Sequence, residues 1–153
     1  MKRFARIARI ASASILMVAA ARAAGAQGMC RTLDVPGATW VEPHGINNNG
    51  DVVGEYSDAN GQYGFVRFAN GQIVTINSPL GTWAIATGIN NAGDVVGAYG
   101  GVPECNCVAD IEAHGFRIIS GAMSSFDIGA SQTIPRGINA FGTIVGYYHD
   151  RDG

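Results

Sequence analysis

Short runs of β-branched and aromatic residues alternate with Asn- and Gly-rich turns along most of the chain. A strand leading from Trp40 to Asn47 is followed by the apolar runs Val52–Tyr56, Tyr63–Phe68 and Ile73–Asn77, and each gap contains an Asn-Gly pair. Asn and Gly tolerate the positive φ of tight hairpin turns, whereas β-branched residues favour strands. This stretch therefore predicts four short antiparallel strands. No later window shows a 3.6-residue apolar period, so we expect almost no helix after the first 26 residues.

The first of these hairpins occurs three times. The pattern Gly-Ile-Asn-x-x-Gly-x-Val/Ile-Val-Gly is found at Gly45–Gly54, Gly88–Gly97 and Gly137–Gly146, with seven of its ten positions fixed. The copies start 43 and then 49 residues apart, which is the period of a stacked or radial repeat architecture. The sequence therefore predicts tandem structural repeats with cores starting at residues 45, 88 and 137.

The predicted strands carry apolar residues on both faces. In the fourth strand, Ile73 and Thr75 alternate with Val74 and Ile76, as in sheets that are covered from both sides. Four antiparallel strands in one period, with both faces buried, are typical of a β-propeller blade. We therefore predict an all-β domain over residues 27–153, built from about two and a half propeller-like blades of four strands each.

Alignment of the copies gives two further strand predictions. Thr32–Pro36 aligns with Thr75–Pro79, so we expect the domain to begin on a fourth strand. In the second copy Phe126–Ile128 takes the fourth-strand place, and after Gly146 only a second strand and the start of a loop remain.

This repeat count is low. Closed propellers have about four to eight blades, and an open array leaves uncovered faces and unpaired edges that invite association. We expect a truncated piece of a longer protein or self-assembly in preference to a small open array, and we do not expect a stable monomer.

The repeat cores resemble the exported bacterial HAF repeats, as do the triplets Tyr63–Phe65, His114–Phe116 and Pro36–Ala38. The resemblance covers Leu33 to Tyr148. It implies a secreted or cell-surface protein with a propeller-like fold, and it implies no established activity and no catalytic residues. The second copy departs from the first by a loop that is eight residues longer.

Residues 1–26 follow a different pattern. Four basic residues precede an uncharged run from Ile10 to Ala21, and the small residues Ala24–Ala26 follow it. The run is too short to span about 30 Å of hydrocarbon as a helix. We predict a helical signal peptide that is cleaved near Ala26, with an uncleaved amphipathic tail as the alternative. The mature protein is then secreted or periplasmic, without a membrane partner.

The charge balance changes when this segment is set aside. It holds five of the ten basic residues and none of the twelve acidic ones, so the remainder has a formal net charge of −7 and no Lys. An acidic surface without Lys argues against nucleic acid and anionic membrane as partners. The acids are scattered singly, so we assign them to solubility. The partners left open are a protein, a glycan or further copies of the chain.

Three cysteines would meet an oxidising compartment after export, where disulfides persist. Because three is odd, at most one internal bridge forms, and we predict that Cys30 pairs with Cys105 or Cys107. Four possible metal ligands lie near this pair: Glu104, Asp110, Glu112 and His114. Structural zinc sites take a Cys pair at wider spacing and a second pair elsewhere. We therefore predict no metal site.

The remaining polar candidates do not form a catalytic pattern. His44, His114 and His149 fall at three different places in the repeat, and His114 takes the place of Tyr63. Three serines lack a His or an acid at a telling spacing: Ser124, Ser125 and Ser131. The Asn48–Asp51 turn lacks the alternating acids of a calcium loop.

Two tryptophans occupy equivalent positions. Trp40 and Trp83 could stack on sugars if they are exposed, but we favour packing between blades. The residues after the last motif glycine share no chemistry, since they are Glu55, Ala98 and Tyr147.

We predict an exported, non-enzymatic repeat protein. It would act as a binding or structural module that presents loops such as Ala98–Ala113 to a protein or glycan. The alternatives are a hydrolase or lyase of the propeller type and a fragment of a longer repeat protein. We assign no catalytic, cofactor-binding or metal-binding residue.

Overall fold

The computed structural model describes residues 31–80, 82–100, 112–128 and 132–150. The chain divides into two compact units, Met1–Arg31 and Thr32–Gly153, and nearly all described residues belong to the second. The predicted signal peptide and all three cysteines lie outside the described residues, and with them the predicted disulfide between Cys30 and Cys105 or Cys107.

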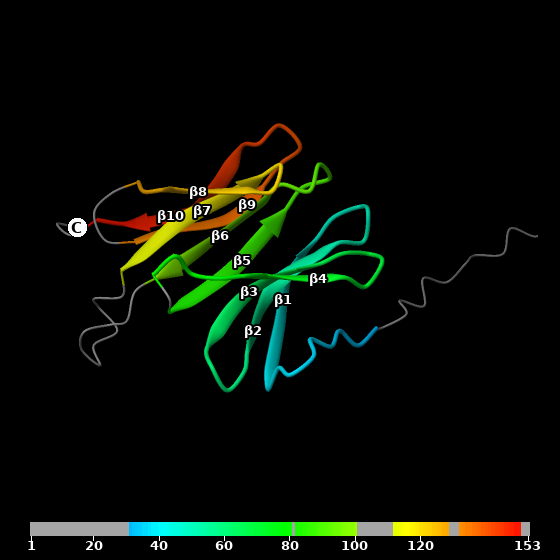
Figure 1. The fold of residues 1–153 in the computed structure, drawn as a ribbon. Coiled ribbons are helices and arrows are strands. Elements are labelled where there is room, and N and C mark those ends of the chain that lie inside the picture. Colours follow the sequence, from blue (N-terminus) through cyan, green and yellow to red (C-terminus); the bar gives the residue numbers. More distant parts are fainter. Residues whose placement is uncertain (1–30, 81, 101–111, 129–131, 151–153) are drawn as a thin grey trace, which may run out of the picture. The chain divides into compact units, whose positions relative to one another are not determined.

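The second unit is all-β, and no helix occurs among its described residues. Ten strands form one curled mixed sheet that resembles half a barrel (Figure 1). The strands are β1 (Trp40–Ile46), β2 (Val52–Ser57), β3 (Gln62–Arg67), β4 (Ile73–Ile76), β5 (Trp83–Ile89), β6 (Val95–Gly100), β7 (Ala113–Ile119), β8 (Ala122–Phe126), β9 (Gln132–Ile138) and β10 (Ile144–His149).

Each repeat is an antiparallel meander. Strands β1 to β4 pair in sequence, β5 to β8 do the same, and β9 with β10 begins a third copy of the repeat. Between successive copies the sheet continues through a single parallel bridge, from Gln62 to Trp83 and from Ala113 to Gln132. The prediction of tandem four-stranded, propeller-like repeats that stop partway through the third is confirmed.

The motif asparagine shapes the first turn of each copy. The Asn47 Oδ1 accepts hydrogen bonds from the backbone N–H groups of Asn49 at 3.0 Å and Asp51 at 2.9 Å. Asn90 and Asn139 do the same in their copies at 2.9 Å. The turn glycine that follows takes a positive φ, which is 86° at Gly50, and only glycine adopts such a φ without strain. The spacing of Asn and Gly that the three copies share is therefore set by the geometry of the turn within each copy.

The same asparagines also join successive copies. The Asn47 Nδ2 donates to the backbone carbonyl of Asn90 at 3.1 Å, and the Asn90 Nδ2 donates to that of Asn139 at 3.1 Å. We call Asn47, Asn90 and Asn139 the asparagine ladder. Its first two members are buried and its last is exposed. No described residue accepts a hydrogen bond from the Asn139 Nδ2, and Thr143 stands where Asp51 and Asp94 accept one in the first two copies.

The first motif glycine allows the copies to approach closely. A Cβ placed on Gly88 would lie 3.0 Å from the Gly137 Cα, and one on Gly45 would lie 3.6 Å from the Gly88 Cα. A Cβ on Gly137 would meet only its own copy, with the Val145 Cγ2 at 3.7 Å. At Gly88 the closest approach is therefore to the next copy, whereas at Gly45 it is to Val53 of its own copy, with the Cγ2 at 3.2 Å.

The largest core cluster lies between the first and second copies. Its buried members are Val53, Val66, Ile76, Ala84, Ala86, Val95, Tyr99 and Phe116. In the middle copy all six residues of β6 are buried, as expected for a sheet covered on both faces. The outer strand β4 departs from this expectation, because Val74 and Thr75 are exposed and only Ile76 is buried.

The predicted fourth strand at Thr32–Pro36 is wrong. No strand forms there, and the segment turns at Pro36 and Gly37, with the Ala38 N–H donating to the Val35 carbonyl at 3.1 Å. A fourth strand needs a third strand of its own copy beside it, and no described strand precedes this segment. Val35 instead packs on Tyr56 and Phe65 and covers the outer face of the first copy.

The predicted fourth strand at Phe126–Ile128 is placed too late. The residues Ser120 and Gly121 both take positive φ, 51° and 80°, so β8 begins directly after β7 and ends at Phe126. The alignment behind the prediction is nevertheless correct, because Phe126 pairs with Gly115 as Ile76 pairs with Gly64.

A matched pair of glycine substitutions tests the stacking of copies. Gly88→Ala should lower the free energy of unfolding by about 1–3 kcal/mol, because the new methyl group overpacks the backbone of the third copy. Gly137→Ala should change it by no more than about 0.5 kcal/mol, because that position faces no further copy. Urea denaturation of both variants measures the difference, and equal losses would contradict the assignment.

Candidate functional site

The polar residues considered for catalysis make structural contacts within single copies of the repeat. The His44 Nε2 lies 3.0 Å from the Glu55 Oε1, and Gln62 donates a hydrogen bond to the same buried carboxylate. The second copy has Thr87 and Ala98 at the places of His44 and Glu55. The polar cluster is therefore a feature of the first copy and is not repeated in the second.

His114 packs as its place in the repeat predicts. Its ring centroid lies 5.3 Å from that of Tyr99, and Tyr63 lies at the same 5.3 Å from Tyr56 in the first copy. The His114 Nδ1 also lies 3.1 Å from the Asp127 Oδ2. The histidine replaces a packing tyrosine at this position.

The serines and tryptophans also have contacts within the sheet. The Ser125 Oγ lies 2.7 Å from the Tyr99 hydroxyl, and Ser124 accepts a hydrogen bond from the Arg117 Nε at 3.2 Å. Ser131 lies outside the described residues. Trp83 is partly buried against Gly100, whereas Trp40 is exposed. The predicted packing role therefore suits Trp83 better than Trp40.

Asp51 uses its carboxylate to hold two turns together. It accepts hydrogen bonds from the Asn47 Nδ2 at 3.0 Å and from the Ala69 backbone N–H at 3.0 Å. These bonds, the Asn47 bond first, lower the pKa of Asp51 from its ordinary value of 3.8. The carboxylate is committed to the turn.

Of the possible metal ligands near the Cys105–Cys107 pair, Glu104 and Asp110 lie outside the described residues. In the described part of the chain, no group of three or more His, Cys, Asp or Glu side chains is close enough to hold a metal ion. A search of the same residues finds no helix with the length and apolar character that a membrane span requires.

The third copy exposes positions that the first two copies bury. Val53 and Val96 are fully buried, whereas the equivalent Val145 is 63% exposed. Glu55 and Ala98 are buried, whereas the equivalent Tyr147 is exposed. In the first copy the covering residues are Ala84 and Ala86 of β5 in the next copy. We call the uncovered face of the third copy, which carries Val145 and Tyr147, the open end.

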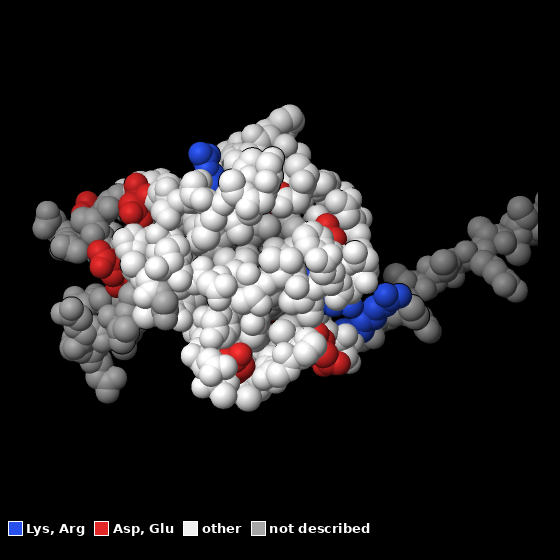
Figure 2. All heavy atoms as spheres, in the orientation of Figure 1, with Lys and Arg blue, Asp and Glu red and all other residues white. Residues whose placement is uncertain are grey.

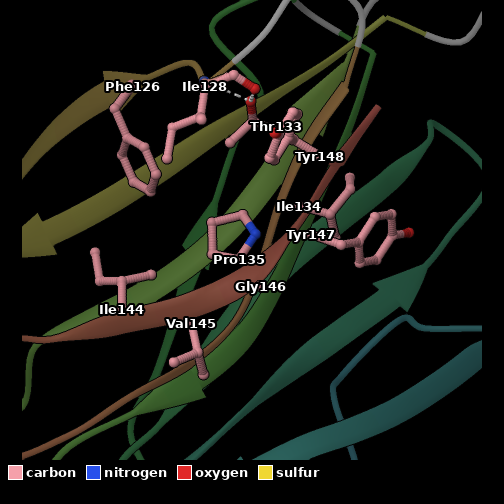
Figure 3. Close-up of a pocket in the computed structure, with 10 residues that line it drawn as sticks. All are labelled: Phe126, Ile128, Thr133, Ile134, Pro135, Ile144, Val145, Gly146, Tyr147 and Tyr148. Atoms are coloured by element: carbon pink, nitrogen blue, oxygen red, sulfur yellow. Dashed lines mark hydrogen bonds between the residues drawn. The ribbon is translucent and has the colours of Figure 1, made fainter. Parts of the chain in front are cut away.

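An apolar pocket of about 320 Å³ lies beside β10. Figure 3 shows the ten residues that line it, from β8, β9 and β10 and the segment after β8, with the Pro135 ring between Phe126 and Gly146. Strand β10 is the last in the order of the sheet, so only β9 pairs with it among the described strands.

Few side chains at the open end are charged. Figure 2 shows one face of the molecule, on which Lys, Arg, Asp and Glu side chains are few and scattered. At the third copy, the Arg136 guanidinium lies 5.2 Å from the centre of the Tyr147 ring. The exposed residues of β10 are therefore mainly apolar and aromatic, with the Arg136 guanidinium beside them.

The low repeat count predicts uncovered faces and unpaired edges, but it does not locate the pocket. Val145 and Gly146 belong to the motif, and motif membership by itself predicts burial. The informative feature is that no described strand pairs with the second edge of β10, which leaves these motif positions without their usual neighbours.

The chain matches no protein-family model, no curated protein and no solved structure. The resemblance to HAF repeats therefore stays a prediction.

The hydrogen bonds that the Asp51 carboxylate accepts from Asn47 and Ala69 give a pH-dependent prediction. Because the folded pKa is lowered, ionised Asp51 stabilises the fold fully above the pKa of the unfolded carboxyl, and this stabilisation is lost as the pH falls through the folded pKa. Asp51→Asn should therefore lower the unfolding temperature at pH 6 and have a smaller effect near pH 3. Thermal unfolding followed by circular dichroism measures this, and a difference independent of pH would contradict it.

Proposed function

We propose that this chain is an exported, non-enzymatic repeat protein that binds a polypeptide partner through its open end. The observation that carries the proposal is the contrast between Val53 and Val96, which are fully buried, and Val145, which is 63% exposed at the same motif position. The first two copies are covered by a following copy, and the third presents the same surface to solvent.

The chemistry of the open end suits a protein partner. Val145 and Tyr147 lie on one uncovered face with Arg136 beside them, and Tyr and Arg are enriched among the residues that contribute most to binding at protein interfaces. Phe141, in the turn before β10, is also exposed. Clustered apolar exposure of this kind is typical of interaction sites.

A non-enzymatic role is supported by the lack of shared chemistry among copies. A propeller active site collects polar residues from several blades at one face. Here the residues that follow the last motif glycine are Glu55, Ala98 and Tyr147, and only Glu55 is an acidic residue. Export is supported by the basic head, apolar run and small residues in the first 26 positions.

Light scattering of the purified protein tests the proposal. Without a partner, the open end should associate with a second molecule of the protein, so the measured mass should exceed that of one chain and fall on dilution. Val145→Glu should give the mass of one chain, because an unpaired carboxylate opposes burial of the face.

Val74→Glu is the matched control, since it places the same charge on the exposed face of β4. It should associate as the wild type does, and circular dichroism should show both variants folded. A wild-type mass of one chain at every concentration, unchanged by Val145→Glu, would overturn the proposal.

A further inference from the structure

The first two copies place a phenylalanine opposite the last motif glycine. In the first copy Gly54 of β2 pairs with Phe65 of β3, and in the second copy Gly97 of β6 pairs with Phe116 of β7. Both phenylalanines are fully buried. The third strand of each complete repeat therefore contributes one ring at a fixed position in the register.

Each ring lies directly against its glycine. A Cβ on Gly97 would lie 2.6 Å from the Phe116 Cζ, and one on Gly54 would lie 2.9 Å from the Phe65 Cε1. Two residues further along the second strand, Tyr56 and Tyr99 each pair with an aromatic residue of the third strand. The third strand thus fills a socket made by the second strand and its neighbours.

The third copy has this socket without its ring. The three atoms nearest to a Cβ on Gly146 belong to the backbone of Ile134 and Pro135, and no aromatic ring is among them. The pocket beside β10 lies at this place, and Pro135, Ile144, Tyr148 and Phe126 are among its walls (Figure 3). Tyr148 is 55% exposed, whereas Tyr56 and Tyr99 are 8% and 7% exposed.

We propose that β10 is a strand acceptor. It binds an extended segment of a separate polypeptide that carries an aromatic-Gly-Phe sequence, runs antiparallel to β10 and seats its Phe in the pocket over Gly146. This inference rests on the proposed function and names the partner's chemistry. The added strand pairs with the free edge of β10, and its Phe fills an apolar socket, which is the general mode of β-strand addition.

We assign the donor to a separate polypeptide, because no described segment of that kind is unpaired. Its sequence contains the pattern only at Tyr63–Phe65 and His114–Phe116. Strand β3 lies between β2 and β4, and strand β7 lies between β6 and β8, so both edges of each are paired. A second folded molecule of this protein would have to open its own sheet to donate either strand.

The Phe of the donor strand should contribute more to the binding affinity than its Gly does. A Cβ on Gly64 would lie 3.3 Å from the Ala86 N of the next copy, and one on Gly115 would lie 2.9 Å from the Thr133 Cγ2. The contacts that require glycine in the third strand therefore include the following copy. At the open end no described copy follows, so an alanine fits there.

A synthetic peptide with the sequence of residues 61–69 serves as the probe. Fluorescence anisotropy of the labelled peptide with the purified protein should show saturable binding of one peptide per chain. The Phe65→Ala peptide should bind at least about tenfold more weakly, as expected for the loss of a buried aromatic side chain. The Gly64→Ala peptide should bind as the parent does.

Protein variants locate the site. Ile144→Glu should abolish peptide binding by placing a carboxylate in the socket, and Val74→Glu on β4 should bind as the wild type does. The peptide series needs no protein variant, so it decides the matter even where Ile144→Glu fails to fold by circular dichroism.

The outcomes separate the two proposals. Absence of binding, or binding that is indifferent to Phe65→Ala, overturns the strand acceptor. If light scattering still shows association that Val145→Glu removes, the open end stands as an interaction face. If neither binding nor association is seen, both proposals are wrong.

Discussion

The contact between successive Gly-Ile-Asn turns is the constraint on which the rest of this structure depends. The side-chain amide of Asn47 donates to the backbone carbonyl of Asn90, and that of Asn90 donates to the carbonyl of Asn139, so the first two turns are each held partly by the next one. The absence of a Cβ at Gly88 lets the backbones of the second and third copies approach, because a Cβ there would lie 3.0 Å from the Gly137 Cα. Such stacking makes each repeat depend on its neighbour for burial, as in other repeat proteins.

This dependence explains why the two ends of the unit differ. At the first copy, Val35 from the preceding segment packs on Tyr56 and Phe65 and covers the outer face. At the third copy, Val145 and Tyr147 stay exposed and the pocket over Gly146 stays open. One end of the stack is therefore capped by the chain itself, and the other is the place where a partner can continue it.

The sequence predicted the elements that depend on local chemistry. Asn-Gly turns and β-branched runs are local signals, so the strands from Trp40 to Ile76 and their order were predicted well. Thr32–Pro36 was wrong because strand formation there depends on a neighbouring strand, which a local alignment cannot supply. The pocket was missed for the same reason, since it lies where no described strand pairs with the second edge of β10.

Hydrogen exchange at three equivalent backbone amides tests the central claim most directly. The N–H groups of Asp51, Asp94 and Thr143 each donate to their own motif asparagine at 2.9 Å, and only the first two have a following copy beside them. The account predicts that, after correction for intrinsic rates, Asp51 and Asp94 exchange more slowly than Thr143, because opening them also disrupts the next copy. Equal protection at all three amides would contradict it.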